Sequence, residues 1–112
     1  MAYEPEAGDL IWTDFDPRVD REQSGRRPAL VVSPRAFWRA SRFAIVCPIT
    51  SRLRGFGTST VLPQGLAVSG EVLNSHLRSI DTEARPIGFA GQAPAAVLAE
   101  VRAKLAALIG IE

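Results

Sequence analysis

Hydrophobic and polar side chains alternate in short runs along most of the chain, a spacing typical of β-strands. The clearest run is residues 9–15 (DLIWTDF). Further strands are expected at residues 29–33, 43–49 and 58–62, and shorter ones near 71–73, 77–81 and 86–90. Ser33 and Pro34 have the form of a helix N-cap followed by a first-turn proline, so a short helical turn should extend to about Trp38.

The last segment follows a helical period. Its apolar residues recur at steps of three and four, and they are Val97, Leu98, Val101, Leu105, Leu108 and Ile109. Pro94 suits the first turn of this helix and Gly110 its end. Short strands followed by one terminal helix predict a single domain over residues 1–112, mainly β, in which the helix caps a small antiparallel barrel or curled sheet. Residues 1–8 are expected to form an extended arm.

A polar loop over residues 16–27 separates the first two predicted strands, and long polar loops in compact domains are usually functional. The loop ends in Arg26 and Arg27, and Pro28 leads directly into an apolar strand. An arginine at the start of a strand is better fixed than one in mid-loop. A fixed guanidinium can stabilise the extra negative charge of a phosphate at its transition state.

Charge is segregated along the chain, although the net charge is only +1. Between Gln23 and Gly70 there is no Asp or Glu, yet seven arginines fall there: 26, 27, 35, 39, 42, 52 and 54. A GC-rich genome would also favour arginine, but it would not separate the two signs. The segment therefore predicts a local basic patch of the kind that binds nucleic acid.

Several functional classes are excluded by what the sequence lacks. No apolar run approaches the ~20 residues of a membrane span, and the acidic N-terminus does not have the form of a signal peptide, so a cytoplasmic protein is expected. Cys47 is the only cysteine and is interpreted as a buried apolar thiol. Phosphate-binding glycine loops, paired cysteines and HExxH are absent, so neither a metal nor a cofactor is expected.

RNA cleavage suits the polar residues that remain, because the 2′-hydroxyl of RNA can attack its own adjacent phosphate. The protein must supply a base near the 2′-oxygen, donors for the phosphorane oxygens, and an acid or positive charge near the leaving 5′-oxygen. Glu22 could be the base, Arg27 could brace the phosphate and Thr50 could donate from its hydroxyl. These three residues are the candidate catalytic set.

Each candidate also has a purely structural interpretation. Glu22 could be a solvated loop acid, and Thr50 could cap a turn. Arg27 could pair with Asp14 or Asp16.

Aromatic residues and the histidine are open to the same two interpretations. His76 could be a half-buried structural residue. Trp12 and Phe15 could both lie in the core, or one of them could lie on a rim and stack on a base.

Four segments carry a resemblance to a known family: GDLIWTDFDP (8–17), EQSGRRPALVVSP (22–34), CPITSRLRG (47–55) and VLNSHLRSID (72–81). In this order they resemble the MazF/PemK toxins of type II toxin–antitoxin systems. The resemblance implies an SH3-like, partly open antiparallel barrel with a C-terminal helix, acting as a homodimer. It also implies sequence-specific, metal-independent cleavage of single-stranded mRNA to a 2′,3′-cyclic phosphate and a 5′-hydroxyl. The residues in matching positions are again Arg27, Thr50 and Glu22.

The chain departs from this family pattern near residue 75. Many members carry an Asp where this chain has Ser75, and the PemK-like branch pairs that Asp with an arginine at the position of Leu73. This chain cannot form that pair. It would rely on Arg27 and Thr50, with His76 as the one side chain whose ordinary pKa lies near neutral pH.

RNA is expected in a basic groove with the candidate residues Phe15, Gln23, Gly25, Arg26, Ser51, Arg52, Arg54, His76 and Arg78. A cognate antitoxin with an acidic, disordered tail would occupy the same groove. Two alternatives remain. One is a non-enzymatic inhibitor on a similar barrel, like the gyrase poison CcdB, which would act through apolar C-terminal residues. The other is an inactive toxin that still binds antitoxin.

Overall fold

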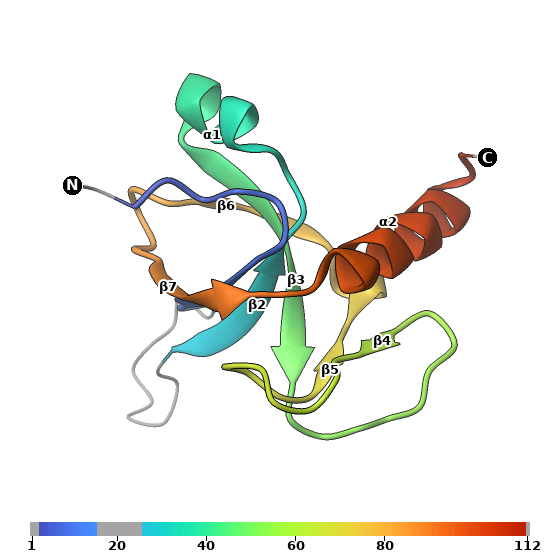
Figure 1. Cartoon of the computed structure of the whole chain (residues 1–112). Coiled ribbons are helices and arrows are strands. Elements are labelled where there is room, and N and C mark those ends of the chain that lie inside the picture. Colours follow the sequence, from blue (N-terminus) through green and yellow to red (C-terminus); the bar gives the residue numbers. More distant parts are fainter. Residues whose placement is uncertain (1–2, 16–25, 112) are drawn as a thin grey trace.

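The structure is a computed structural model that describes residues 3–15 and 26–111 (Figure 1). Its strands are β1 (Asp9–Thr13), β2 (Arg27–Val31), β3 (Phe43–Thr50), β4 (Thr60–Val61), β5 (Glu71–Val72), β6 (Arg78–Asp81) and β7 (Gly88–Gln92). Its helices are α1 (Arg35–Ser41), the short 3-10 helix η1 (Asn74–His76) and α2 (Ala95–Ile109). Short strands followed by one long terminal helix match the order that the sequence predicts.

The strands form one antiparallel sheet that does not close. Their order is β4-β5-β3-β2-β1-β7, and β6 pairs with β3 outside this path. The central strand β3 changes partner along its length. Its first half pairs with β6, residues 46–48 pair with β2, and its last two residues pair with β5. A strand shared in this way curls the sheet, which confirms the predicted mainly β, partly open barrel with a C-terminal helix.

Both faces of this sheet are covered. Side chains alternate between the faces of a strand, and the neighbours Leu10 and Ile11 are both fully buried, in two different hydrophobic clusters. Helix α2 packs Val97 and Val101 onto the cluster that contains Leu10. Cys47 lies in the same cluster, and burial raises the pKa of its thiol to about 12, which confirms the interpretation as a structural thiol.

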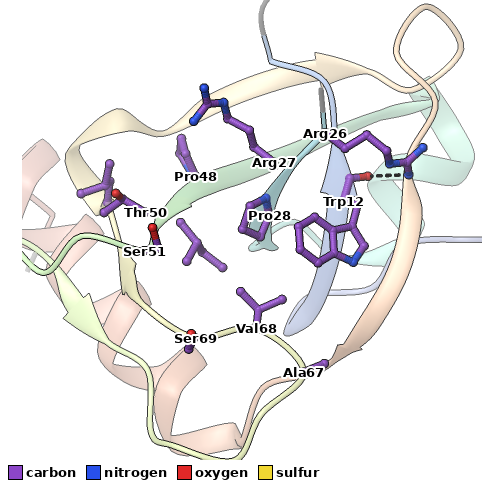
Figure 2. A pocket seen from close by; sticks show the side chains of 12 residues that line it. Trp12, Arg26, Arg27, Pro28, Pro48, Thr50, Ser51, Ala67, Val68 and Ser69 are labelled. Atoms are coloured by element: carbon purple, nitrogen blue, oxygen red, sulfur yellow. Dashed lines mark hydrogen bonds between the residues drawn. The ribbon is translucent and has the colours of Figure 1, made fainter. Parts of the chain in front are cut away.

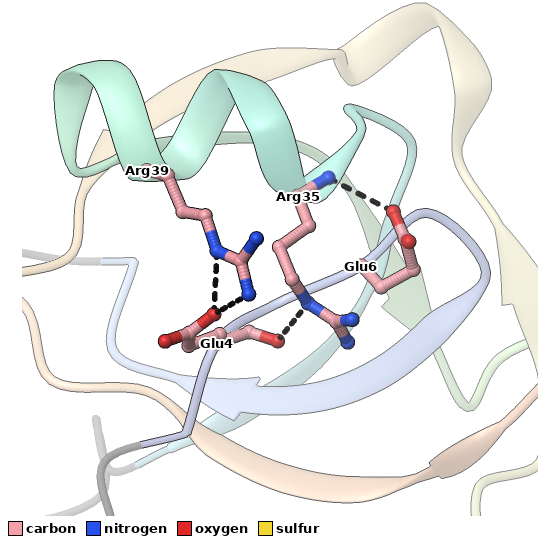
Figure 3. Close-up of polar contacts among 4 residues, drawn as sticks. All are labelled: Glu4, Glu6, Arg35 and Arg39. Atoms are coloured by element: carbon pink, nitrogen blue, oxygen red, sulfur yellow. Dashed lines mark hydrogen bonds and ion pairs between the residues drawn. The ribbon is translucent and has the colours of Figure 1, made fainter.

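The predicted N-cap of α1 is wrong. The hydroxyl of Ser33 instead accepts a hydrogen bond from the Ile45 N–H at 2.9 Å. The first N–H group of α1, on Arg35, donates to Oε1 of Glu6 at 2.8 Å (Figure 3). The cap therefore comes from the N-terminal segment, which packs against the sheet with Pro5 and Gly8 buried.

Element boundaries differ from the predicted ones by a few residues. Strand β2 begins at Arg27 rather than residue 29, because Arg27 pairs with Thr13 of β1. Strand β1 ends at Thr13 and not at Phe15, and β4 keeps only two of the five residues expected at 58–62. Helix α1 extends three residues past Trp38 to Ser41, and its C-cap is Arg42, whose φ of 66° is left-handed. Gly110 ends α2 in the same conformation, as predicted.

Candidate active site

The ends of two neighbouring strands bring the two described catalytic candidates together. Strands β2 and β3 are antiparallel and pair Ala29 with Pro48, so the start of β2 and the end of β3 lie at the same edge of the sheet. Arg27 is exposed at the start of β2, while Thr50 is half-buried at the end of β3. The two side chains therefore enter one region from neighbouring strand ends.

This region is an open pocket of about 670 Å³. Its walls combine apolar residues with a few polar groups, as is usual for ligand sites. The polar lining residues are Arg26, Arg27, Thr50, Ser51 and Ser69, and the apolar ones are Trp12, Pro28, Pro48, Ile49, Ala67, Val68 and Leu73 (Figure 2). The residues come from β1, from β2 and β3 with the residues that flank them, from the segment between β4 and β5, and from Leu73 directly after β5, so only the folded sheet assembles them.

Thr50 is held in place by its backbone and by its side chain. It pairs with Glu71 of β5, and its carbonyl lies so close to Gly70 that a Cβ on Gly70 would come within 2.1 Å of the oxygen. The backbone N–H of Arg52 donates to Oγ1 of Thr50 at 3.2 Å. Because the hydroxyl accepts this bond, its own O–H is available to donate to a ligand oxygen in the pocket.

The loop that follows Thr50 is fixed by a buried carboxylate. Glu71 is 0% exposed, and its Oε1 accepts hydrogen bonds from the N–H groups of Arg54 and Gly55 at 2.6 and 3.2 Å. The bond from Arg54 is the main cause of a lowered pKa for Glu71. Arg52 and Arg54 themselves are exposed and do not line the pocket, so the loop displays positive charge beside it.

Other predicted RNA-binding residues lie away from the pocket. The guanidinium of Arg78 stacks 5.1 Å above the ring of Phe15, and that ring packs against the cluster around Ile11. His76 is exposed at the end of η1 and does not line the pocket. Glu22, Gln23 and Gly25 lie outside the described residues. The roles assigned to these residues remain predictions.

Two further residues line the pocket, although they are not among the candidate site residues predicted from the sequence. Leu73, at the position of the PemK-type arginine, contributes an apolar wall where that branch would have a charge. Trp12 was assigned either to the core or to a rim, and the structure places it in the pocket lining. It is the one exposed position of β1, in a strand whose other four residues are buried. Strand alternation alone would not single it out, because Leu10, two residues earlier on the same face of the strand, is fully buried.

Within residues 3–15 and 26–111, no three or more His, Cys, Asp and Glu side chains gather in a way that could hold a metal ion. In the same ranges, no helix has the length and apolar character that crossing a membrane requires.

Comparisons with known proteins agree on one family. Residues 6–109 match the family described as PemK-like, MazF-like toxin of type II toxin–antitoxin system. The endoribonuclease toxin MazF of Escherichia coli K12 is 36% identical over 108 residues, which cover 96% of each chain. The crystal structure of MazF (Form-I) from Deinococcus radiodurans is 47% identical, with a TM-score of 0.88 over 98% of this chain and 100% of that one. A MazE–MazF complex (Form-II) from the same organism is 44% identical, with the same TM-score over 99% and 100%.

Proposed function

Because this chain belongs to the PemK-like, MazF-like toxin family of type II toxin–antitoxin systems, we propose that it is an RNA-cleaving toxin whose reaction takes place in the pocket between Arg27 and Thr50. The observation that carries this assignment is that these two side chains line one open pocket from adjacent strand ends. A cationic group and a hydroxyl donor placed together are what a pentacovalent phosphate needs.

The reaction uses the 2′-hydroxyl of the substrate as nucleophile. A base, for which Glu22 is the candidate, takes the 2′ proton, and the 2′-oxygen bonds to the adjacent phosphorus. The bond from phosphorus to the 5′-oxygen breaks, that oxygen takes up a proton from water, and the protonated base returns its proton to the solvent. The products are a 2′,3′-cyclic phosphate and a 5′-hydroxyl. Arg27 stabilises the negative charge that develops on the phosphorane, and the O–H of Thr50 donates to one of its oxygens.

A cognate antitoxin inhibits the protein, and the toxin itself acts as a homodimer in the cytoplasm, where mRNA is the target. The relative from Deinococcus radiodurans has been crystallised with MazE, which supports an antitoxin partner here. An acidic tail would bind the exposed arginines 26, 27, 52 and 54 and so block RNA by occupancy. No metal takes part, because substrate and side chains supply the nucleophile, the base and the charge.

The direct test is to incubate the purified protein with a long RNA in EDTA and map the new ends. Site-specific 5′-hydroxyl ends are expected from the wild type. Arg27→Ala should cleave roughly 100- to 1000-fold more slowly, since one transition-state donor typically contributes that much. Arg39→Gln is the matched control, because Arg39 pairs with Glu4 and does not line the pocket. Intact RNA with the wild type would favour a non-enzymatic inhibitor or an inactive toxin instead.

A further inference from the structure

The pocket has a second wall that the proposed chemistry does not use. Trp12 lies across the pocket from Thr50 (Figure 2). Its side chain is 36% exposed although the rest of β1 is buried. An indole in this position presents a flat apolar face to whatever enters the pocket.

Arg26 lies against the backbone of Trp12. Its Nη2 donates to the carbonyl oxygen of Trp12 at 3.2 Å (Figure 2). Strand β7 makes room for the guanidinium, because the residue paired with Trp12 is Gly88. A Cβ on Gly88 would come within 2.7 Å of Nη2 of Arg26. Arg26 therefore has a defined position beside Trp12, and its other N–H groups remain as donors.

Phe15, the aromatic residue expected to contact RNA, is less suited than Trp12 to stack on a base. Its ring is already covered by the guanidinium of Arg78 and packs against the core. Of these two aromatic residues of the first predicted strand, only Trp12 lines the pocket.

We propose that Trp12 and Arg26 form a subsite for one base next to the scissile phosphate, with the base stacked on the indole and its edge read by the guanidinium. This inference rests on the proposed RNA cleavage. Arginine is a donor only, so the edge that faces it must offer acceptors. Guanine and uracil meet this requirement with carbonyl oxygens, whereas the corresponding edge of adenine carries an amino group. The subsite therefore selects guanine, through O6, or uracil, through O4, over adenine, whose N6 amino group would face the guanidinium.

Stacking is tested by binding, without cleavage. The probe is an RNA carrying the preferred site with a 2′-deoxy nucleotide at the scissile position, so it cannot react. Trp12→Ala and Trp12→Leu should each bind it about 5- to 150-fold more weakly, which corresponds to one stacked base. Trp12→Phe should keep most of the affinity because it keeps an aromatic face. Equal affinity of the Leu and Phe variants would overturn the proposal.

Tryptophan fluorescence gives a second measurement on the same complex. The chain has two tryptophans, and Trp38 is buried against Arg42 in a different pocket. Binding of the probe should quench the wild type, and the change should disappear in Trp12→Phe. Should Trp12→Phe show the same quenching as the wild type, Trp12 does not contact the base.

Base reading is tested with a randomised RNA library. The wild type should cleave sites with guanine or uracil at one position beside the cut, at least tenfold more often than sites with adenine. Arg26→Gln should lose this preference at that position and keep the base preferences at the other positions of the cleavage site. Arg26→Lys should also lose it, because lysine keeps the charge without the planar fork. Arg39→Gln controls for the loss of one charge elsewhere.

The two proposals fail in different ways. If the wild type leaves RNA intact but binds the randomised RNA library, and Trp12→Leu weakens this binding while Trp12→Phe does not, the cleavage proposal fails and the stacking surface stands. If the wild type cleaves with an unchanged base preference in Arg26→Gln, the subsite fails and the cleavage proposal stands.

Discussion

Glu71 occupies an uncommon position for a carboxylate, because acidic side chains are rarely fully buried without partners. Its Oε1 accepts two backbone N–H groups from the loop that follows Thr50. Such bonds favour the charged form and hold the pKa of Glu71 below its ordinary value. A single buried charge thus orders the segment that carries Arg52 and Arg54.

This arrangement predicts a pH dependence of stability. A carboxyl whose pKa is lowered in the folded state stabilises the fold above the ordinary Glu pKa of 4.5, and the contribution is lost as the pH falls through the lowered value. The melting temperature of the wild type should therefore decrease as the pH is lowered below about 4.5. Glu71→Gln should have a lower melting temperature than the wild type at pH 7, and its melting temperature should decrease less on acidification.

The comparison should be made as a melting curve at each pH for both proteins. Glu6 and Glu100 also have lowered pKa values, so only the difference between the two proteins reports on Glu71. Parallel curves from pH 7 to pH 3 would show that the charge of Glu71 does not hold the loop.

At the scale of elements, α1 depends on a residue 29 positions earlier in the chain. Oε1 of Glu6 accepts the first N–H of this helix, and the same bond lowers the pKa of Glu6. Glu4 lies nearby and forms an exposed ion pair with Arg39 at 2.8 Å (Figure 3). The two carboxylates lie in the same segment but make different kinds of contact.

Removing the two carboxylates separately should distinguish a cap from a surface ion pair. Glu6→Ala should lower the free energy of unfolding by about 1 kcal/mol, as for the loss of an N-cap. Glu4→Ala should cost less than about 0.5 kcal/mol, because exposed pairs contribute little. Urea denaturation measures both, and faster amide exchange at the start of α1 should appear only in Glu6→Ala. Equal losses would contradict the capping role.

Gly70, at the end of the segment between β4 and β5, lies close to the backbone of Thr50. Its φ is +132°, and a Cβ there would meet the Thr50 carbonyl oxygen at 2.1 Å. Gly65 is the matched control, since its φ is +94° and nothing lies within 4 Å of an added Cβ. Gly65→Ala should cost about 1–2 kcal/mol from backbone strain alone. Gly70→Ala should cost more, and should also lower kcat because Thr50 must move.

Both glycine variants are compared by denaturation and by RNA cleavage at saturating substrate. A Gly70→Ala protein as active and as stable as Gly65→Ala would show that the close approach to Thr50 does not matter.

The sequence predicted elements well where a local period defines them. Residues 97–109 carry a helical period and form α2, and the run at 43–49 forms β3. Failures arose where distant residues decide the outcome. Ser33 satisfied every local rule for an N-cap, yet β3 draws its hydroxyl away. The run at 58–62 predicted a strand of five residues, yet only Thr60 and Val61, which pair with β5, form β4.

At the scale of the whole molecule, the curled sheet explains which parts of the site could be predicted from the sequence. Chemistry and family resemblance together selected Arg27 and Thr50, and both line the pocket from the start of β2 and the end of β3. The wall formed by Trp12 and Ala67–Ser69 depends on how the β4–β5 segment folds over β1 and β2. No local pattern contains that information, because a pocket built from separate segments of the chain is a tertiary feature.

The central claim is that Arg27 and Thr50 act on the same phosphate in one pocket. A double-mutant cycle of single-turnover RNA cleavage tests it most directly, using Arg27→Ala, Thr50→Val and the double variant. Each single variant should slow cleavage roughly 100- to 1000-fold. Groups that stabilise one transition state together are strongly non-additive, so the double variant should be within about tenfold of the slower single variant. If the rate loss of the double variant instead equals the product of the two single losses, the two residues act independently, and the shared site is contradicted.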